Sequence, residues 1–151
     1  MNMVFIAVGL MTALEAFLTR RTWPQRPSAM VGLILIAVAG AGAIMVGLAP
    51  ADENLVLHGV GALLQVPANV GLLLLGVASW RSHRRIAVFS LVCGSVGTAA
   101  SVLWVSGSYL GLGSGGMERL TIDPLTIWTT VIGTVLLWRY TRGSPTGVTS
   151  A

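Results

Sequence analysis

The sequence predicts an all-α protein, an integral membrane bundle of five transmembrane helices. Hydrophobic residues make up 54% of the chain and charged residues only 9%, whereas about a quarter of a globular domain is charged. The polar residues gather in short connections between five apolar stretches, each close to the roughly 20 residues that a spanning helix needs. A chain of 151 residues has room for these helices as one bundle and for no separate soluble domain.

The first expected helix covers residues 1–18, which are apolar except for Thr12 and Glu15. A secretory signal peptide would need a positive segment at its start, and no arginine precedes Arg20. We therefore interpret the stretch as a spanning helix. Near its far end, Glu15 is expected to reach the interface or to pair with Arg20 or Arg81, and a proton-relay role is the alternative.

The second expected helix covers residues 29–48 and carries no charge. Small residues recur at every fourth position, which gives one smooth side where another helix can approach closely. These residues are Ala39, Ala43 and Gly47. Pro50 ends the helix.

The third expected helix covers residues 55–80, after an acidic turn at residues 52–54 that offers side chains to cap it. Pro67 lies inside the helix, and a proline lacks the N–H that the helical ladder needs. The pattern therefore predicts a kink near residues 63–67.

The fourth expected helix covers residues 86–110. Its small residues predict close packing against a neighbour. They are Gly94, Gly97, Ser101, Gly107 and Gly111.

The fifth expected helix covers residues 122–140 and follows a glycine-rich loop at residues 111–123, which we expect to be mobile or tightly turned. Pro124 after Asp123 is typical of a first helical position after an N-cap. Residues 143–151 are expected to form a flexible tail.

Charge predicts the orientation. Eight of the nine arginines lie in the connections after the first and third helices and after the last one. The opposite side has Arg119 alone, together with acidic residues. The positive-inside rule places the arginine-rich side in the cytoplasm, so that the N-terminus is outside and the C-terminus cytoplasmic. No charge guides the first helix outward, and we expect that an upstream first helix is missing from this reading frame.

The segment Val46–Ala62, VGLAPADENLVLHGVGA, resembles the multi-pass membrane family known as domain of unknown function 998. The shared pattern is Gly with apolar residues, Pro, an acidic turn and a His that enters an apolar helix. The segments Gly115–Leu120 and Asn2–Leu14 are similar to that family's Glu-Arg loop and second helix. The resemblance implies about six helices, of which this chain has the second onward, and it implies no activity.

Polar residues in the third helix form the main candidate site. His58, Gln65 and Asn69 are spaced by seven and four residues, so they are expected to share one helix face. Groups at such depth usually face the bundle, where they bond neighbouring helices, line a ligand or ion pocket, or serve transport. The outer connections are expected to add a polar mouth, built from Asp52, Glu53, Glu118, Arg119 and Asp123.

Within this mouth, Glu118 and Arg119 are expected to form an exposed salt bridge. Alternatively, Arg119 pairs with Asp52 or Glu53, or contacts a lipid phosphate. A zinc site at His58 would need more than one histidine, and His83 lies on the other side. We expect no metal and no cofactor, and no motif for a catalytic nucleophile or phosphate loop occurs.

These observations favour a non-enzymatic membrane protein: an accessory or sensor subunit, or a binder of lipid or a small hydrophobic molecule. The alternative is a small transporter or a proton or ion pathway through His58, Gln65, Asn69 and Glu15, and an intramembrane enzyme ranks third. We expect the bilayer, other membrane subunits or a second copy as partners, and no nucleic acid, because the arginines flank apolar spans. The expected location is a bacterial cell membrane, since the chain is rich in Ala, Gly and Val and has no Lys.

Overall fold

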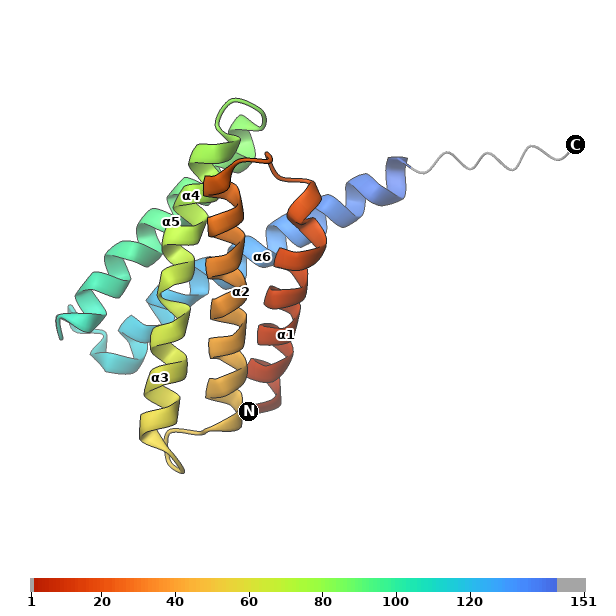
Figure 1. Ribbon diagram of the computed structural model, residues 1–151. Coiled ribbons are helices and arrows are strands. Elements are labelled where there is room, and N and C mark those ends of the chain that lie inside the picture. The colour runs from red at the N-terminus through yellow and green to blue at the C-terminus, as the bar shows by residue number, and fades with distance from the viewer. Residues whose placement is uncertain (1, 144–151) are drawn as a thin grey trace, which may run out of the picture.

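The computed structural model describes residues 2–143, and every regular element within them is a helix (Figure 1). The elements are α1 (Asn2–Leu18), the short turn η1 (Thr19–Arg21), α2 (Pro27–Leu48), α3 (Leu55–Gln65), α4 (Pro67–Ser79), α5 (Arg84–Val105) and α6 (Gly113–Gly143). With α3 and α4 taken as one broken helix, five helices are long and apolar enough to cross a membrane. The predicted all-α, five-span bundle is confirmed.

Helices α3 and α4 are the predicted third span, interrupted at Val66. Pro67 supplies no N–H there, and the chain tightens so that the N–H of Val66 donates to the carbonyl of Leu63 and that of Asn69 to the carbonyl of Val66. These bonds join residues that are three apart in the sequence instead of four, as expected where a proline interrupts the helical ladder. The disturbance predicted from Pro67 is therefore present as an interruption of the hydrogen-bond ladder, while Val66 keeps helical dihedral angles (φ −56°, ψ −45°).

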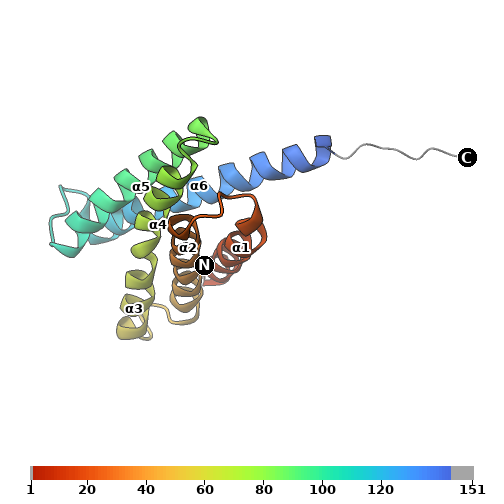
Figure 2. The same cartoon turned by 45° about the horizontal axis from the view of Figure 1, so that its top comes forward.

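Helix α2 is the centre of the bundle. It packs against α1 on one side and against α3 and α4 on the other, and α5 then packs on α4 and α6 on α5. Figures 1 and 2 show that α6 crosses the α1–α2–α3 group obliquely in both views. The predicted smooth side of α2 is buried at Ala39, Ala43 and Gly47, which confirms it as a packing face.

Helix α2 meets three neighbours through pairs of glycines that bring the backbones together. The pairs are Gly9 with Gly40, Gly42 with Gly61, and Gly32 with Gly71. A methyl group on Gly42 would lie 2.6 Å from the carbonyl oxygen of Gly61, and one on Gly32 would lie 2.8 Å from that of Gly71. Such distances leave no room for a Cβ, so these helices approach as closely as small-residue packing in membranes allows.

Helix α6 begins at Gly113, so the expected glycine-rich loop at 111–123 and the expected helix start at Pro124 are both wrong. Pro124 lies inside the helix. The physical reason is a continuous buried stripe that runs through this segment at helical spacing and packs on the bundle. The stripe comprises Met117, Thr121, Leu125, Trp128 and Ile132.

Helix α5 ends at Val105, five residues before the expected end at Leu110. Gly107 and Gly111 have φ values of 76° and 82° and turn the chain toward α6, with no atom near enough to pack against them. Their predicted role in close packing is therefore wrong. The expected tail at 143–151 lies outside the described residues, apart from Gly143 at the end of α6.

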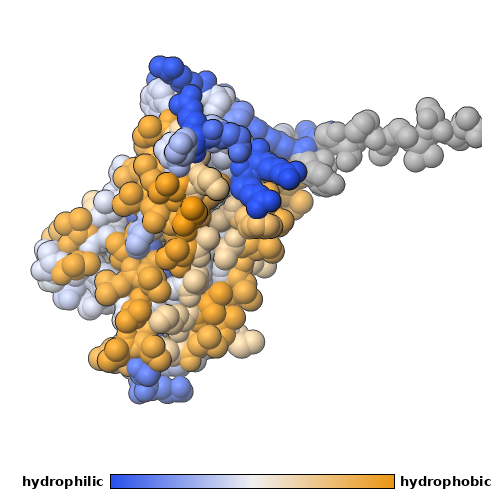
Figure 3. Space-filling model, viewed as in Figure 1, coloured by the Kyte–Doolittle hydropathy of each residue, from blue (hydrophilic) through white to orange (hydrophobic). Residues whose placement is uncertain are grey.

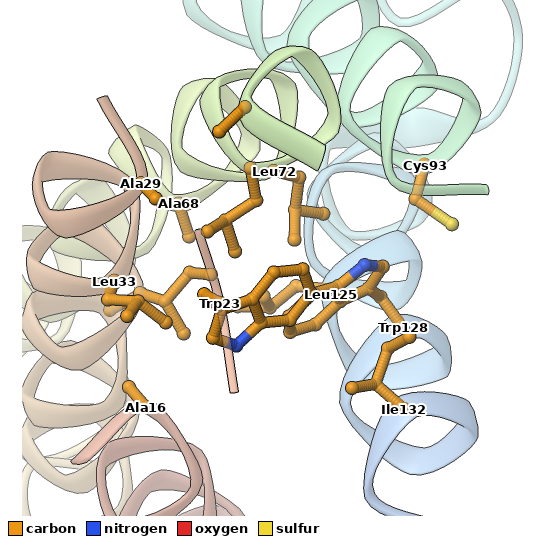
Figure 4. Close-up of a cluster of buried hydrophobic side chains, with 14 residues drawn as sticks. Ala16, Trp23, Ala29, Leu33, Ala68, Leu72, Cys93, Leu125, Trp128 and Ile132 are labelled. Atoms are coloured by element: carbon orange, nitrogen blue, oxygen red, sulfur yellow. The ribbon is translucent and has the colours of Figure 1, made fainter. Parts of the chain in front are cut away.

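An aromatic pair fills the space between the α1–α2 connection and α6. Trp23, from the connection between α1 and α2, stacks on Trp128 of α6 with ring centroids 5.6 Å apart (Figure 4). The indole of Trp128 donates to Ser90 Oγ of α5 at 2.8 Å. The burial of Trp23 could not be predicted from its position in a basic connection, yet the residue is only 7% exposed.

The surface carries a wide apolar belt between two polar ends (Figure 3). Large apolar side chains are exposed on it, among them Leu14, Met30, Val77 and Val102. At one end of the bundle, three guanidinium groups lie over aromatic rings at 4.2–4.7 Å: Arg20 over Phe17, Arg84 over Trp80 and Arg142 over Trp138. Such pairs suit a membrane interface, where arginine and tryptophan are both stable.

Candidate functional site

The predicted polar mouth forms in part. His58 of α3 and three residues of α6, Glu118, Arg119 and Asp123, line one pocket of about 280 Å³. Phe5 of α1 and Ile122 close its apolar side. The structure therefore brings together four of the eight predicted site residues, from two helices that are distant in the sequence.

Asp52 and Glu53 do not line this pocket. Both are exposed in the turn that precedes α3. Arg119 forms no ion pair within 4.0 Å with either of them or with Glu118 in the part of the chain that the structure describes, so the expected salt bridges are absent. Exposed charges gain little from pairing, because water screens them and the side chains lose rotamer freedom.

His58 closes the corner between α2 and α3. Its Nδ1 lies 3.1 Å from the carbonyl oxygen of Ala49, the residue that ends α2, and it donates there when it carries the proton. The side chain of Asn54 accepts from the N–H of Leu57 and caps α3. The end of one helix and the start of the next are thus satisfied within the acidic turn.

A metal site at His58 finds no support in these positions. Among residues 2–143, no three His, Cys, Asp or Glu side chains lie close enough together to hold a metal ion. His58 also directs Nδ1 at a backbone carbonyl. The second histidine, His83, precedes α5 near the opposite end of the bundle.

The single polar face expected for the third helix is divided between different neighbours. Gln65 packs beside Gly42 of α2, and its amide donates to the carbonyl of Gly61 on its own helix at 3.4 Å. Asn69, beyond the break, contacts α5 and α6 instead. The break at Val66 thus lets two neighbouring polar residues serve different helices.

Asn69 is the polar centre of the bundle. It is 1% exposed, and its side-chain amide donates to Ser101 Oγ of α5 and to the carbonyl oxygen of Thr121 in α6, both at 3.1 Å. One residue of α4 therefore bonds two other helices, so that three helices are joined at this point. This arrangement matches the expected helix-to-helix bonding rather than an open ligand pocket.

The partners of Asn69 are arranged around it. Ser101 Oγ donates in turn to the carbonyl of Gly97 at 2.6 Å. Thr121 lies three residues before Pro124, in the turn of α6 that precedes the proline. The missing N–H of Pro124 removes the helical donor of the carbonyl one residue earlier, at Leu120, so the bond from Asn69 is an additional contact to the same turn. Sequence spacing alone could not have assigned Thr121 to Asn69.

Gly97 makes room for the Asn69 side chain. A methyl group at Gly97 would collide with the side-chain amide of Asn69. A methyl group at Gly94 would lie 2.9 Å from the backbone carbonyl oxygen of Asn69. The close packing predicted for these two glycines is confirmed. It serves to admit a polar side chain as well as a helix backbone.

Glu15 points toward α6 instead of the arginines. A methyl group on Gly133 would lie 3.8 Å from Glu15 Oε1, and that oxygen is buried with no hydrogen-bond partner within residues 2–143. No ion pair within 4.0 Å joins Glu15 to Arg20 or Arg81 among the described residues. The expected pairing is therefore wrong, since the packing of α6 against α1 covers the carboxyl group.

A second, mostly apolar pocket lies on the outside of the bundle between the α3–α4 break and the end of α5. We call it the α4–α5 groove. It encloses about 440 Å³ and is lined by Val66, Val70, Thr98, Ser101, Val102, Val105 and Ser106. The hydroxyl oxygen of Thr98 is buried and has no hydrogen-bond partner in the part of the chain that the structure describes.

The groove follows from the divergence of α3 and α5. Helix α4 packs along α5, whereas α3 leans on α2 (Figure 1). Beyond Val66 the two elements separate and leave the groove between them. The sequence gives no signal for this groove, because its residues are those of an ordinary lipid-facing helix.

Comparison of the chain with protein-family models, with curated proteins and with solved structures finds no match in any of the three.

Proposed function

We propose that this protein is a non-enzymatic multi-pass membrane protein that binds a lipid or a small hydrophobic molecule in the α4–α5 groove, as an accessory or sensor protein. The observation that carries the proposal is a buried, unpartnered hydroxyl at Thr98 in an otherwise apolar pocket of about 440 Å³. Ligand sites in proteins have this size and this composition, with few polar groups that orient the ligand.

The groove selects for a molecule with one polar group and an apolar body. Valine side chains cover most of its wall and offer only dispersion and burial of apolar surface. The hydroxyl groups of Ser101 and Ser106 already donate to the carbonyls of Gly97 and Leu103. Thr98 is therefore the polar group that remains for a ligand. Its hydroxyl oxygen is buried, so a carbonyl, ester or hydroxyl group on the ligand would satisfy it once the side chain turns toward the groove.

Native mass spectrometry of the purified chain tests the proposal, with lipids extracted from the host membrane added back. The Val102→Trp variant fills the groove and is expected to lose the bound molecule. The Val96→Trp variant places the same ring on the same helix outside the groove and is expected to keep it. Both valines are exposed, at 64% and 45%, so neither change disturbs the core.

The Thr98→Val variant tests the polar contact alone, since it keeps the volume and removes the hydroxyl. We expect weaker retention by a factor of about 5–10, the worth of one hydrogen bond. Equal retention in the wild type and the Val102→Trp variant would contradict binding in this groove.

The proposal includes the orientation and location of the bundle. The arginine-rich end faces the cytoplasm and the mouth at His58 faces outward, which the uneven distribution of arginine supports. The host membrane is a bacterial cell membrane. Membership in the domain of unknown function 998 family belongs to the same proposal, supported by the acidic turn and the histidine that follows it.

The transport alternative has less support. A proton or ion pathway through Gln65 and Asn69 needs polar groups that exchange partners with water. Gln65 is 5% exposed and Asn69 is 1% exposed, and both donate to acceptors within the protein. These bonds suit a fixed junction between helices better than a relay.

A further inference from the structure

The arginine-rich end of the bundle carries cations without acidic partners. Of the five acidic residues, four are at the mouth end or in the turn before α3, and only Glu15 lies near the arginines. Glu15 is turned toward Gly133. Among residues 2–143, no ion pair within 4.0 Å neutralises an arginine. Anions from outside the chain must therefore balance this charge.

Two of these arginines converge on one pocket from different connections. Arg26 comes from the α1–α2 connection and Arg81 from the turn after α4, and both line a pocket of about 540 Å³. Trp80 forms part of the wall, and Val77 and Leu91 continue it toward the apolar belt. We call this pocket the Arg26–Arg81 groove.

The chemistry of the groove changes along its length. At the polar end, two guanidinium groups present donors that match the oxygens of a phosphate. Arg26 also immediately precedes the first residue of α2, so the positive end of a helix dipole adds to the charge there. Toward the bilayer centre, Val77 and Leu91 offer a purely apolar surface. Charge above and hydrocarbon below match a phospholipid with its head group at the interface.

We propose that the Arg26–Arg81 groove binds one anionic phospholipid, with the phosphate held between the two arginines and an acyl chain along Val77 and Leu91. The Trp80 ring orders the site from the side, because Arg84 lies over it at 4.7 Å and fixes the edge of the groove. This site is separate from the α4–α5 groove in residues and in ligand chemistry. Lipid binding at the Arg26–Arg81 groove can therefore be correct even if ligand binding in the α4–α5 groove is not.

The test uses the full chain in detergent with added phosphatidylglycerol or phosphatidylcholine, and native mass spectrometry to measure the affinity of the first bound lipid. The wild type is expected to prefer phosphatidylglycerol. The Arg26→Gln/Arg81→Gln variant is expected to lose about tenfold in that affinity, since two charge-assisted contacts are removed. Phosphatidylcholine binding is expected to fall by a smaller factor, because its choline cation offsets the charge of the phosphate and the arginines gain less from it.

The matched control is Arg21→Gln/Arg139→Gln, which removes the same charge from the same end but leaves the groove intact. It is expected to bind phosphatidylglycerol within about twofold of the wild type, since only screened surface charge is lost. Equal losses in the two double variants would overturn the proposal, because binding would then follow net charge alone.

A third variant, Val77→Trp, blocks the acyl-chain part of the groove without touching an arginine. Val77 is 61% exposed, so the variant should fold like the wild type. It is expected to lower the affinity for phosphatidylglycerol and to leave any binding of inorganic phosphate unchanged. Undiminished lipid affinity in this variant, or full competition by inorganic phosphate, would also overturn the proposal.

Discussion

The side-chain amide of Asn69 in α4 donates to the backbone carbonyl of Thr121 in α6 across 3.1 Å. This bond joins segments that are 52 residues apart, in the turn of α6 that precedes Pro124. Two prolines, Pro67 and Pro124, thus weaken two helices close to the same polar contact. Because the hydrocarbon region of a membrane supplies no water, a donor and an acceptor that satisfy each other inside the bundle stabilise the contact between α4 and α6.

Replacement of Asn69 by Leu should destabilise the bundle by about 1–3 kcal/mol, because two interhelical hydrogen bonds are lost at a fully buried position. Gln65→Met is the matched control. Gln65 bonds only its own helix, so the expected loss is below about 0.5 kcal/mol. Reversible unfolding in mixed micelles measures both values. Equal losses would mean that Asn69 does not hold the helices together.

Gly97→Ala should displace the Asn69 side chain, since the new methyl group would collide with its amide. We expect a loss of about 1–3 kcal/mol in the wild type and a clearly smaller loss in the Asn69→Ala background, where the obstacle is gone. Gly59→Ala is the control, because nothing lies within 4 Å of that position. Additive losses at residues 97 and 69 would show that the two do not interact.

Glu15→Gln should leave the bundle as stable or make it more stable by up to about 1 kcal/mol, because a buried carboxyl oxygen without a partner is costly. Glu118→Gln at the mouth is the comparison and should change stability by less than about 0.5 kcal/mol. Unfolding at neutral pH measures both. A loss above about 1 kcal/mol in Glu15→Gln would reveal a partner for the carboxylate.

Cysteine labelling should report the orientation. In a Cys93→Ala background, Ser114→Cys at the start of α6 is expected to react with a membrane-impermeant maleimide in intact cells, and Ser82→Cys only after lysis. Both serines are exposed, so access is not limited by packing. Reaction of residue 82 alone in intact cells would reverse the orientation that the arginines predict.

The spans could be predicted because hydropathy and charge act locally. Hydrophobic runs of the right length located all five helices, and Pro67 located the break in the third, since a proline disrupts its own helix whatever surrounds it. Gly94 and Gly97 were also recognised as packing positions. Each of these conclusions depends on residues that are near one another in the chain.

The start of α6 could not be predicted in the same way. The glycines and Pro124 favour a loop locally. Met117 and Trp128, however, are buried on one stripe of α6, and this stripe stabilises the helix only once it packs against the bundle. Tertiary packing therefore overrides local propensity across this segment. A search for helical periodicity across Pro124 would have found the stripe.

The candidate site was half predictable for a related reason. The polar residues themselves were recognisable by their depth in an apolar helix, but their partners were not. Asn69 bonds a backbone carbonyl in α6, and the α4–α5 groove is lined mainly by valines that resemble any lipid-facing surface. Both depend on how helices cross, and hydropathy does not encode crossing angles.

A structure of the chain determined by electron cryomicroscopy in native membrane lipids would test the binding role of the α4–α5 groove most directly. We predict an elongated density in the groove, with a polar atom within hydrogen-bonding distance of Thr98 Oγ1. A groove closed by contact between α5 and α3, with Thr98 bonded to its own helix, would contradict the proposed function.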